Sequence, residues 1–92
     1  MAHFTVRVEF HDGSMTHYLM LYKELAARSF ADTIEAEKVT YKLPTGEFNY
    51  EGNKTKDQVL ALVKDAAARV LRSYSILVTE SSGRRFFNLR KV

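Results

Sequence analysis

The alternation of apolar and polar residues near the start of the chain predicts a β-strand. In residues 4–10 every second side chain is apolar, and Thr5, Arg7 and Glu9 lie between them. A period of two is typical of a strand with one buried and one exposed face. We therefore expect the apolar set in the core and the polar set on an uncovered face of a sheet.

Two stretches carry apolar residues every three or four positions and predict helices. The first helix starts at Ser14 or Thr16, either of which can cap it, and ends near residue 30. Its apolar stripe is expected to be Met15, Leu19, Tyr22, Ala26 and Phe30. The second helix opens with a capping box between Thr55 and Gln58 and continues to about residue 72.

A hairpin is predicted between the two helices. Residues 33–43 are rich in β-branched and aromatic side chains, and their alternation changes phase near Glu37 and Lys38, where a bulge or break is expected. The turn at residues 44–46 should then return the chain into a short strand at residues 48–50.

A second hairpin is predicted at the C-terminus, from strands at residues 74–78 and 84–89 around the turn at residues 81–83. The resulting order favours one domain over residues 1–92. It is a ferredoxin-like α+β sandwich, β-α-β-β-α-β with an extra C-terminal strand, in which two helices cover one face of an antiparallel sheet. The expected core is Phe4, Val6, Val8, Phe10, Leu19, Phe30, Val59, Leu62, Val63, Val70, Ile76 and Val78.

Composition excludes several classes of site. The 92 residues include no Cys, which rules out disulfides, thiolate nucleophiles, zinc ribbons and iron–sulfur centres. The sequence shows neither a signal-peptide pattern nor a run of about 20 apolar residues. We therefore expect a cytoplasmic protein with no membrane partner.

Charge is unevenly divided along the chain, whose net charge is +3. Residues 1–53 carry five Lys and Arg against eight Asp and Glu, and residues 54–92 carry nine against three. A basic half favours contacts with phosphate, and basic residues interleaved with aromatic ones favour single-stranded nucleic acid. The candidate RNA-binding residues are Arg7, Arg84, Arg85, Phe86, Arg90 and Lys91.

A structural interpretation of the same C-terminal run stays open. Its arginines could serve only to keep the edge of a terminal strand soluble. Phe87 has the phase of Leu89 in that strand, so we expect the loss of its ring to impair folding.

Known motifs narrow the function by their absence. The expected third strand reads Glu47-Phe48-Asn49-Tyr50 and lacks the Lys/Arg-Gly-aromatic motif of RNA-recognition domains. The sequence contains no Gly-rich phosphate loop, no H-E-x-x-H and no G-x-S-x-G. The sequence therefore gives no support for an RNA-recognition domain or for the enzyme classes that these motifs define.

Candidate catalytic residues follow the first strand. Asp12, His11 and His17 place a carboxylate and two imidazoles around one loop. Because imidazole can take or give a proton near neutral pH, such a loop could cleave RNA through its 2′-hydroxyl. We expect no bound cofactor, with Mg²⁺ on Asp12 as an alternative. The structural alternative is that Asp12 and Ser14 form a turn and cap the helix.

Two tracts, Tyr41–Thr55 and Ser75–Arg84, carry a resemblance that extends over nearly the whole chain. The sequence resembles the GhoS-type endoribonuclease antitoxin family of type V toxin–antitoxin systems, short bacterial and prophage proteins formerly described as a domain of unknown function. The resemblance implies a Cas2-like ferredoxin fold and cleavage of the messenger RNA of a small membrane-active toxin. Cas2-like proteins keep an Asp at the end of the first strand, and Asp12, preceded by His11, lies there in this sequence.

Three functions follow as hypotheses. The first is an antitoxin-like endoribonuclease that cleaves single-stranded RNA. The second is a non-enzymatic module of phage or prophage origin that binds RNA or a protein. The third is a small ligand-sensing or dimer-forming domain, and either a monomer or a homodimer is compatible with the sequence.

Overall fold

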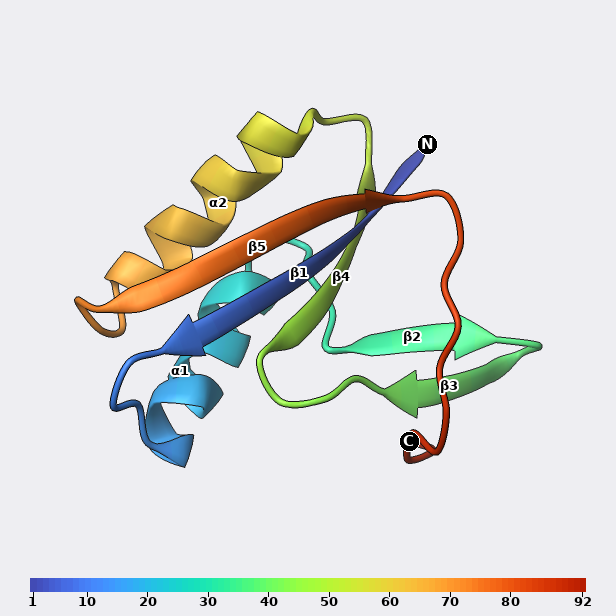
Figure 1. Ribbon diagram of the computed structural model, residues 1–92, viewed down its shortest axis with the longest axis horizontal. Coiled ribbons are helices and arrows are strands. Elements are labelled where there is room, and N and C mark those ends of the chain that lie inside the picture. Colours follow the sequence, from blue (N-terminus) through green and yellow to red (C-terminus); the bar gives the residue numbers. More distant parts are fainter.

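The computed structural model describes residues 1–92 as two helices, a three-stranded sheet and a separate two-stranded hairpin (Figure 1). In chain order the elements are β1 Ala2–Phe10, α1 Met15–Ala26, β2 Thr33–Ala36, β3 Val39–Lys42, β4 Glu47–Gly52, α2 Lys56–Ala68 and β5 Tyr74–Ser81.

The sheet has the order β4-β1-β5 and is antiparallel throughout. Val6 lies opposite Phe48 on β4 and Val78 on β5, so the apolar side chains of all three strands share one face. Both helices pack on that face, and neither covers the other face (Figure 1). The expected α+β class, with an antiparallel sheet and two helices on one side, is therefore confirmed.

The core forms where this sheet face meets α1 and α2. Most of the expected residues lie in it, and Phe4, Val6, Val59 and Val63 are fully buried. Four expected core residues are only partly buried against the cluster, namely Leu62, Val70, Ile76 and Val78. The sheet is narrow, so residues near its margin keep some contact with solvent.

Helix α1 differs from its expected form in both length and phase. It ends at Ala26, four residues earlier than expected, and Leu21 and Leu25 form its buried stripe. The expected core residue Leu19 is 54% exposed. Apolar side chains occur on more than one face of this helix, and packing against the sheet selects one of them.

The capping box of α2 is present as expected. The backbone N–H of Gln58 donates to Thr55 Oγ1 at 3.1 Å, and the backbone N–H of Thr55 donates to Gln58 Oε1 at 2.9 Å. The helix ends at Ala68 instead of near residue 72. Neither helix of the structure has both the length and the apolar character needed to cross a membrane.

An arginine joins the two helices at the surface. Arg28 Nη2 donates to Asp65 Oδ2 of α2 at 2.7 Å, and Nη1 donates to Glu24 Oε1 of α1 at 3.0 Å. These hydrogen bonds raise the pKa of Arg28 above its usual value, and the bond to Asp65 contributes more than the bond to Glu24. The two carboxylates favour the charged guanidinium.

The expected hairpin between residues 33–43 and 48–50 is wrong. Instead, β2 and β3 pair with each other, with Thr33 opposite Lys42, and β4 pairs with β1. The break expected near Glu37 and Lys38 is the turn of this hairpin, where both residues have positive φ. A single β-bridge, between Ala31 and Asn49, pairs this region with the outer edge of β4.

The expected C-terminal hairpin is also wrong. Residues 84–90 form no strand beside β5. They leave the sheet edge and run to the β2–β3 hairpin, where Lys91 bridges to Tyr41 of β3 (Figure 1). The strand beyond the β-α-β-β-α-β pattern therefore lies between the two helices, where the chain forms β2, β3 and β4, and β5 stays at the edge of the sheet.

Replacing Val63 by aspartate should unfold the domain. Val63 is fully buried, so Val63→Asp would place an unpaired carboxylate among apolar side chains, at a cost of about 4 kcal/mol or more. Thermal and urea unfolding followed by circular dichroism would measure the loss. Ala61→Asp, at an exposed position of the same helix, is the control and should lower stability by less than about 1 kcal/mol. Equal melting of parent and Val63→Asp would refute the packing of α2.

Candidate nucleic-acid interface

The uncovered face of the sheet is polar and carries both signs of charge. Thr5, Arg7 and Glu9 lie on it, as the alternation of β1 predicts. Cross-strand pairing adds three rows of neighbours to this face: His3 with Glu51 and Ser81, Thr5 with Asn49 and Thr79, and Arg7 with Glu47 and Leu77. We call this surface the open face.

The C-terminal segment, residues 84–92, crosses from β5 over the open face and is held at three places. Arg84 Nη1 donates to Asn49 Oδ1 at 2.8 Å and to Thr5 Oγ1 at 3.3 Å. The Phe86 ring packs on Tyr41 of β3 with centroids 4.8 Å apart. Farther on, the Lys42 N–H donates to the carbonyl of Arg90 at 2.8 Å. These contacts explain why the segment does not extend the sheet.

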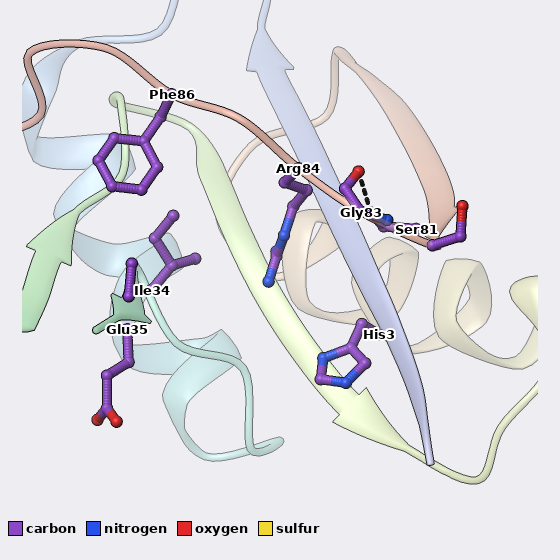
Figure 2. A pocket seen from close by; sticks show the side chains of 9 residues that line it. His3, Ile34, Glu35, Ser81, Gly83, Arg84 and Phe86 are labelled. Atoms are coloured by element: carbon purple, nitrogen blue, oxygen red, sulfur yellow. Dashed lines mark hydrogen bonds between the residues drawn. The ribbon is translucent and has the colours of Figure 1, made fainter. Parts of the chain in front are cut away.

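A groove opens where this segment, the β2–β3 hairpin and the open face meet. It has a volume of about 320 Å³ and is lined by His3, Ile34, Glu35, Ala36, Ser81, Ser82, Gly83, Arg84 and Phe86. In Figure 2 the Arg84 side chain lies in the groove, with Ile34 and Phe86 on one side and His3 on the other. The groove therefore combines an arginine, an aromatic ring, the carboxylate of Glu35 and small polar groups.

Arg84 forms no ion pair in this groove, which Glu35 also lines. Its two acceptors, Thr5 and Asn49, are neutral, and it makes none of the ion pairs of the structure. Both bonds use Nη1, so the N–H groups of Nε and Nη2 have no protein acceptor. A guanidinium held in this way is suited to a phosphate or carboxylate oxygen.

The other candidate basic residues do not line this groove. Arg85 is exposed, and its Nη1 donates to the carbonyl of Arg84 at 2.9 Å. Arg90 and Lys91 have exposed side chains while their backbone pairs with β3. Arg7 is exposed on the open face, between Glu47 and Leu77. The structure thus brings Arg7, Arg84 and Arg85 to one side of the molecule.

The two phenylalanines of the segment exchange their expected roles. Phe86 is 40% exposed because one side of its ring packs on Tyr41, whereas Phe87 is 92% exposed. The prediction that Phe87 is needed for folding is wrong, because residues 84–89 do not form a strand and their alternation does not report burial. Its free ring offers a flat apolar surface on which a base could stack.

The candidate catalytic residues lie at the opposite end of β1 from His3. His11 follows β1 and holds both ring nitrogens near serine hydroxyls, with Nδ1 at 2.8 Å from Ser73 Oγ and Nε2 at 2.9 Å from Ser75 Oγ. His11 lies six positions along the chain from Thr5, which is beside Arg84, and six positions correspond to roughly 20 Å along a strand. The loop and the groove are therefore two separate parts of one surface.

His17 has a structural role. Its Nδ1 accepts a hydrogen bond from the backbone N–H of Ser14 at 2.9 Å, and Ser14 is the N-cap of α1. An accepting Nδ1 carries no proton, so this bond selects the tautomer protonated on Nε2. The ring therefore closes the first turn of the helix.

The structural alternative for this loop is present in the structure. His11 and Asp12 form a turn in which the Gly13 N–H donates to the Phe10 carbonyl at 3.4 Å, and Ser14 is the N-cap of α1. Asp12 contributes its backbone to this turn. Asp12 is exposed and has a φ of 61°, a left-handed conformation that Asp and Asn adopt more readily than most residues. The structure shows no group of three or more His, Asp or Glu side chains placed to hold a metal ion. Mg²⁺ on Asp12 would thus need ligands from RNA phosphate or water.

Comparison with models of protein families and with curated protein sequences finds no match for this chain. The resemblance to the endoribonuclease antitoxins therefore stays a prediction, based on the two sequence tracts.

Removing the Phe87 ring should leave stability almost unchanged. Because Phe87 is 92% exposed, Phe87→Ala should shift the unfolding free energy by less than about 0.5 kcal/mol. Phe86→Ala should cost more, about 1 kcal/mol, since it removes the contact with Tyr41. Urea denaturation of both variants measures this order, and a larger loss for Phe87→Ala would show that the segment packs differently.

Proposed function

We propose that the protein binds single-stranded RNA across the open face and acts on it as an antitoxin-like endoribonuclease in the cytoplasm. The observation that carries the proposal is Arg84, a half-buried guanidinium that hydrogen-bonds only to neutral acceptors and forms no ion pair in the structure. Its position in a groove favours a ligand that brings its own negative charge. RNA supplies phosphate oxygens for Arg84 and bases for the exposed ring of Phe87.

The layout of the open face suggests a path for the RNA strand. From Arg84 the strand would pass Arg7 and reach the loop that follows β1, where His11 and Asp12 lie exposed. The carboxylates of Glu9 and Glu47 on the same face would repel a ligand with a high density of negative charge, such as an RNA duplex. We therefore expect one extended strand to bind in preference to a duplex.

Cleavage at the loop would use the 2′-hydroxyl of the RNA itself. That oxygen attacks the neighbouring phosphorus and loses its proton, the bond to the 5′-oxygen breaks, and the leaving oxygen takes up a proton. The products are a 2′,3′-cyclic phosphate and a 5′-hydroxyl. His11 and Asp12 are the groups assigned to proton transfer.

One observation favours binding without cleavage as the second candidate function. Both ring nitrogens of His11 are held by Ser73 and Ser75, and no carboxylate contacts the ring. A histidine held by two hydroxyls can be a structural link between β1 and the start of β5. RNA binding through Arg84 does not depend on this loop.

Removal of two arginines should weaken RNA binding while the sheet and both helices stay folded. Each lost phosphate contact should lower affinity by roughly tenfold at about 0.1 M salt, and Arg84→Ala with Arg85→Ala should reduce the slope of log affinity against log salt by about 1 to 2. Fluorescence anisotropy with labelled single-stranded RNA of several sequences measures both quantities.

The matched control removes the same amount of charge from α2. Lys56→Ala with Lys64→Ala changes exposed lysines on the helical side of the sheet and should leave RNA affinity within about threefold of the parent. If both double variants lose affinity equally, binding reports net charge alone and the groove is not the site.

Asp12→Asn should separate cleavage from folding. Asparagine tolerates the left-handed backbone of this position, so the melting temperature should stay almost constant while RNA cleavage falls by more than about tenfold. His11→Ala belongs in the same series, and parallel reactions with EDTA report whether a metal takes part.

The control for this series is Glu37→Asn, which changes an acidic residue with a φ of 50° in the β2–β3 turn. It should cleave like the parent. If the Asp12 and His11 variants also cleave like the parent, the loop is not the active site. RNA that stays intact with the parent protein, while the arginine variants still lose binding, would establish the non-enzymatic alternative.

A further inference from the structure

Strand β5 has one edge that nothing in the structure pairs. It is the last strand of the order β4-β1-β5, with β1 on its inner side. The His11 N–H donates to the Ser73 carbonyl, so odd-numbered residues of β5 exchange hydrogen bonds with β1. In an antiparallel ladder the residues between them point the other way. The backbone N–H and C=O groups of Tyr74, Ile76, Val78 and Glu80 therefore face outward.

This edge lacks the features that protect sheet edges in monomeric proteins. Such edges are usually short, or carry Lys, Pro or a bulge, or are covered by another segment. β5 has eight residues, no Pro and no Lys or Arg, and Glu80 is its one charged side chain. The other sheet edge differs, because Ala31 occupies the outer side of β4 at Asn49.

We propose that β5 pairs in antiparallel fashion with β5 of a second copy of this chain. The register follows from the outward-facing groups. Only an alignment centred on residue 77 pairs all four of them, with Ile76 opposite Val78 of the other copy and Tyr74 opposite Glu80. Every free N–H and C=O of these residues is then used in both strands.

The same register explains an exposed leucine. Leu77 is 64% exposed on the otherwise polar open face. At the centre of the proposed ladder it lies directly opposite Leu77 of the other copy, in a non-hydrogen-bonded pair whose Cα atoms are about 4.5 Å apart. Thr79 then lies opposite Ser75, so hydroxyl side chains flank the leucine pair. Each residue meets a compatible neighbour.

The two-fold symmetry of this pairing determines on which side of the joined sheet the two open faces lie. Antiparallel neighbours related by a two-fold axis have that axis perpendicular to the sheet, so both open faces lie on the same side. The product is a six-stranded sheet with all helices on the opposite side. Because the pairing uses the backbone of β5 and not the groove, it does not depend on RNA binding.

A single cysteine tests the register, since the native chain contains no Cys. Leu77→Cys should form a disulfide-linked dimer under mild oxidation, because residue 77 meets its own copy. Thr79→Cys is the matched control on the same face. Its two copies would lie about 13 Å apart in this register and should crosslink at least roughly tenfold more slowly. Equal crosslinking rates would overturn the register.

Sedimentation tests the association itself. The parent should approach twice the mass of the 10.6 kDa chain as concentration rises towards about 1 mM, as expected for a small interface. Leu77→Lys brings two like charges together and should raise the dissociation constant more than about tenfold. Met15→Lys, at a similarly exposed apolar position on α1, should leave it unchanged. A parent that stays monomeric, or a dimer that Leu77→Lys leaves intact, would refute the proposal.

Discussion

The burial of one face of β1 is the constraint on which the rest of the structure depends. Phe4 and Val6 are fully buried, and Val8 and Phe10 nearly so, in a strand that is paired along both edges. A strand in this position has no freedom of register, because a shift of one residue would place Thr5 and Arg7 in the core. The same alternation therefore builds the core and sets the polar residues of the open face.

The C-terminal segment turns that open face into a surface with a candidate function. Had residues 84–89 paired with β5, Arg84 would not reach Thr5 and Asn49, and the groove would not exist. The same departure leaves the outer edge of β5 unpaired. The candidate RNA site and the free edge of β5 therefore have the same cause, which is that the C-terminal segment pairs with β3 and not with β5.

In the loop after β1, the surrounding structure gives the three candidate catalytic residues different contacts. His17 lies within reach of the first turn of α1 and accepts a backbone hydrogen bond there. Ser14 caps the helix, and Asp12 belongs to the turn before it, with an exposed side chain. His11 has a contact of its own, with two serines at the start of β5. The three candidate catalytic residues, His11, Asp12 and His17, are close in sequence but therefore differ in the reactions that they could take part in.

The sequence by itself determined the features that depend on near neighbours. The alternation of β1, the capping box at Thr55, the change of phase at Glu37 and the α+β class all follow from local patterns, and the structure contains them. Each pattern records which side of an element is apolar or which side chain can reach a nearby amide. Such preferences act within a few residues and survive in any fold that buries the apolar side.

Only the tertiary structure decided which elements meet. The pairing of β4 with β1, the face of α1 that packs, and the path of residues 84–92 depend on competition between distant partners. Arg84 reaches acceptors that are 79 and 35 residues away in sequence, and no local periodicity encodes such a contact. For the same reason the exposure of Phe87 could not be foreseen, since alternation predicts burial only for a segment that has a sheet to join.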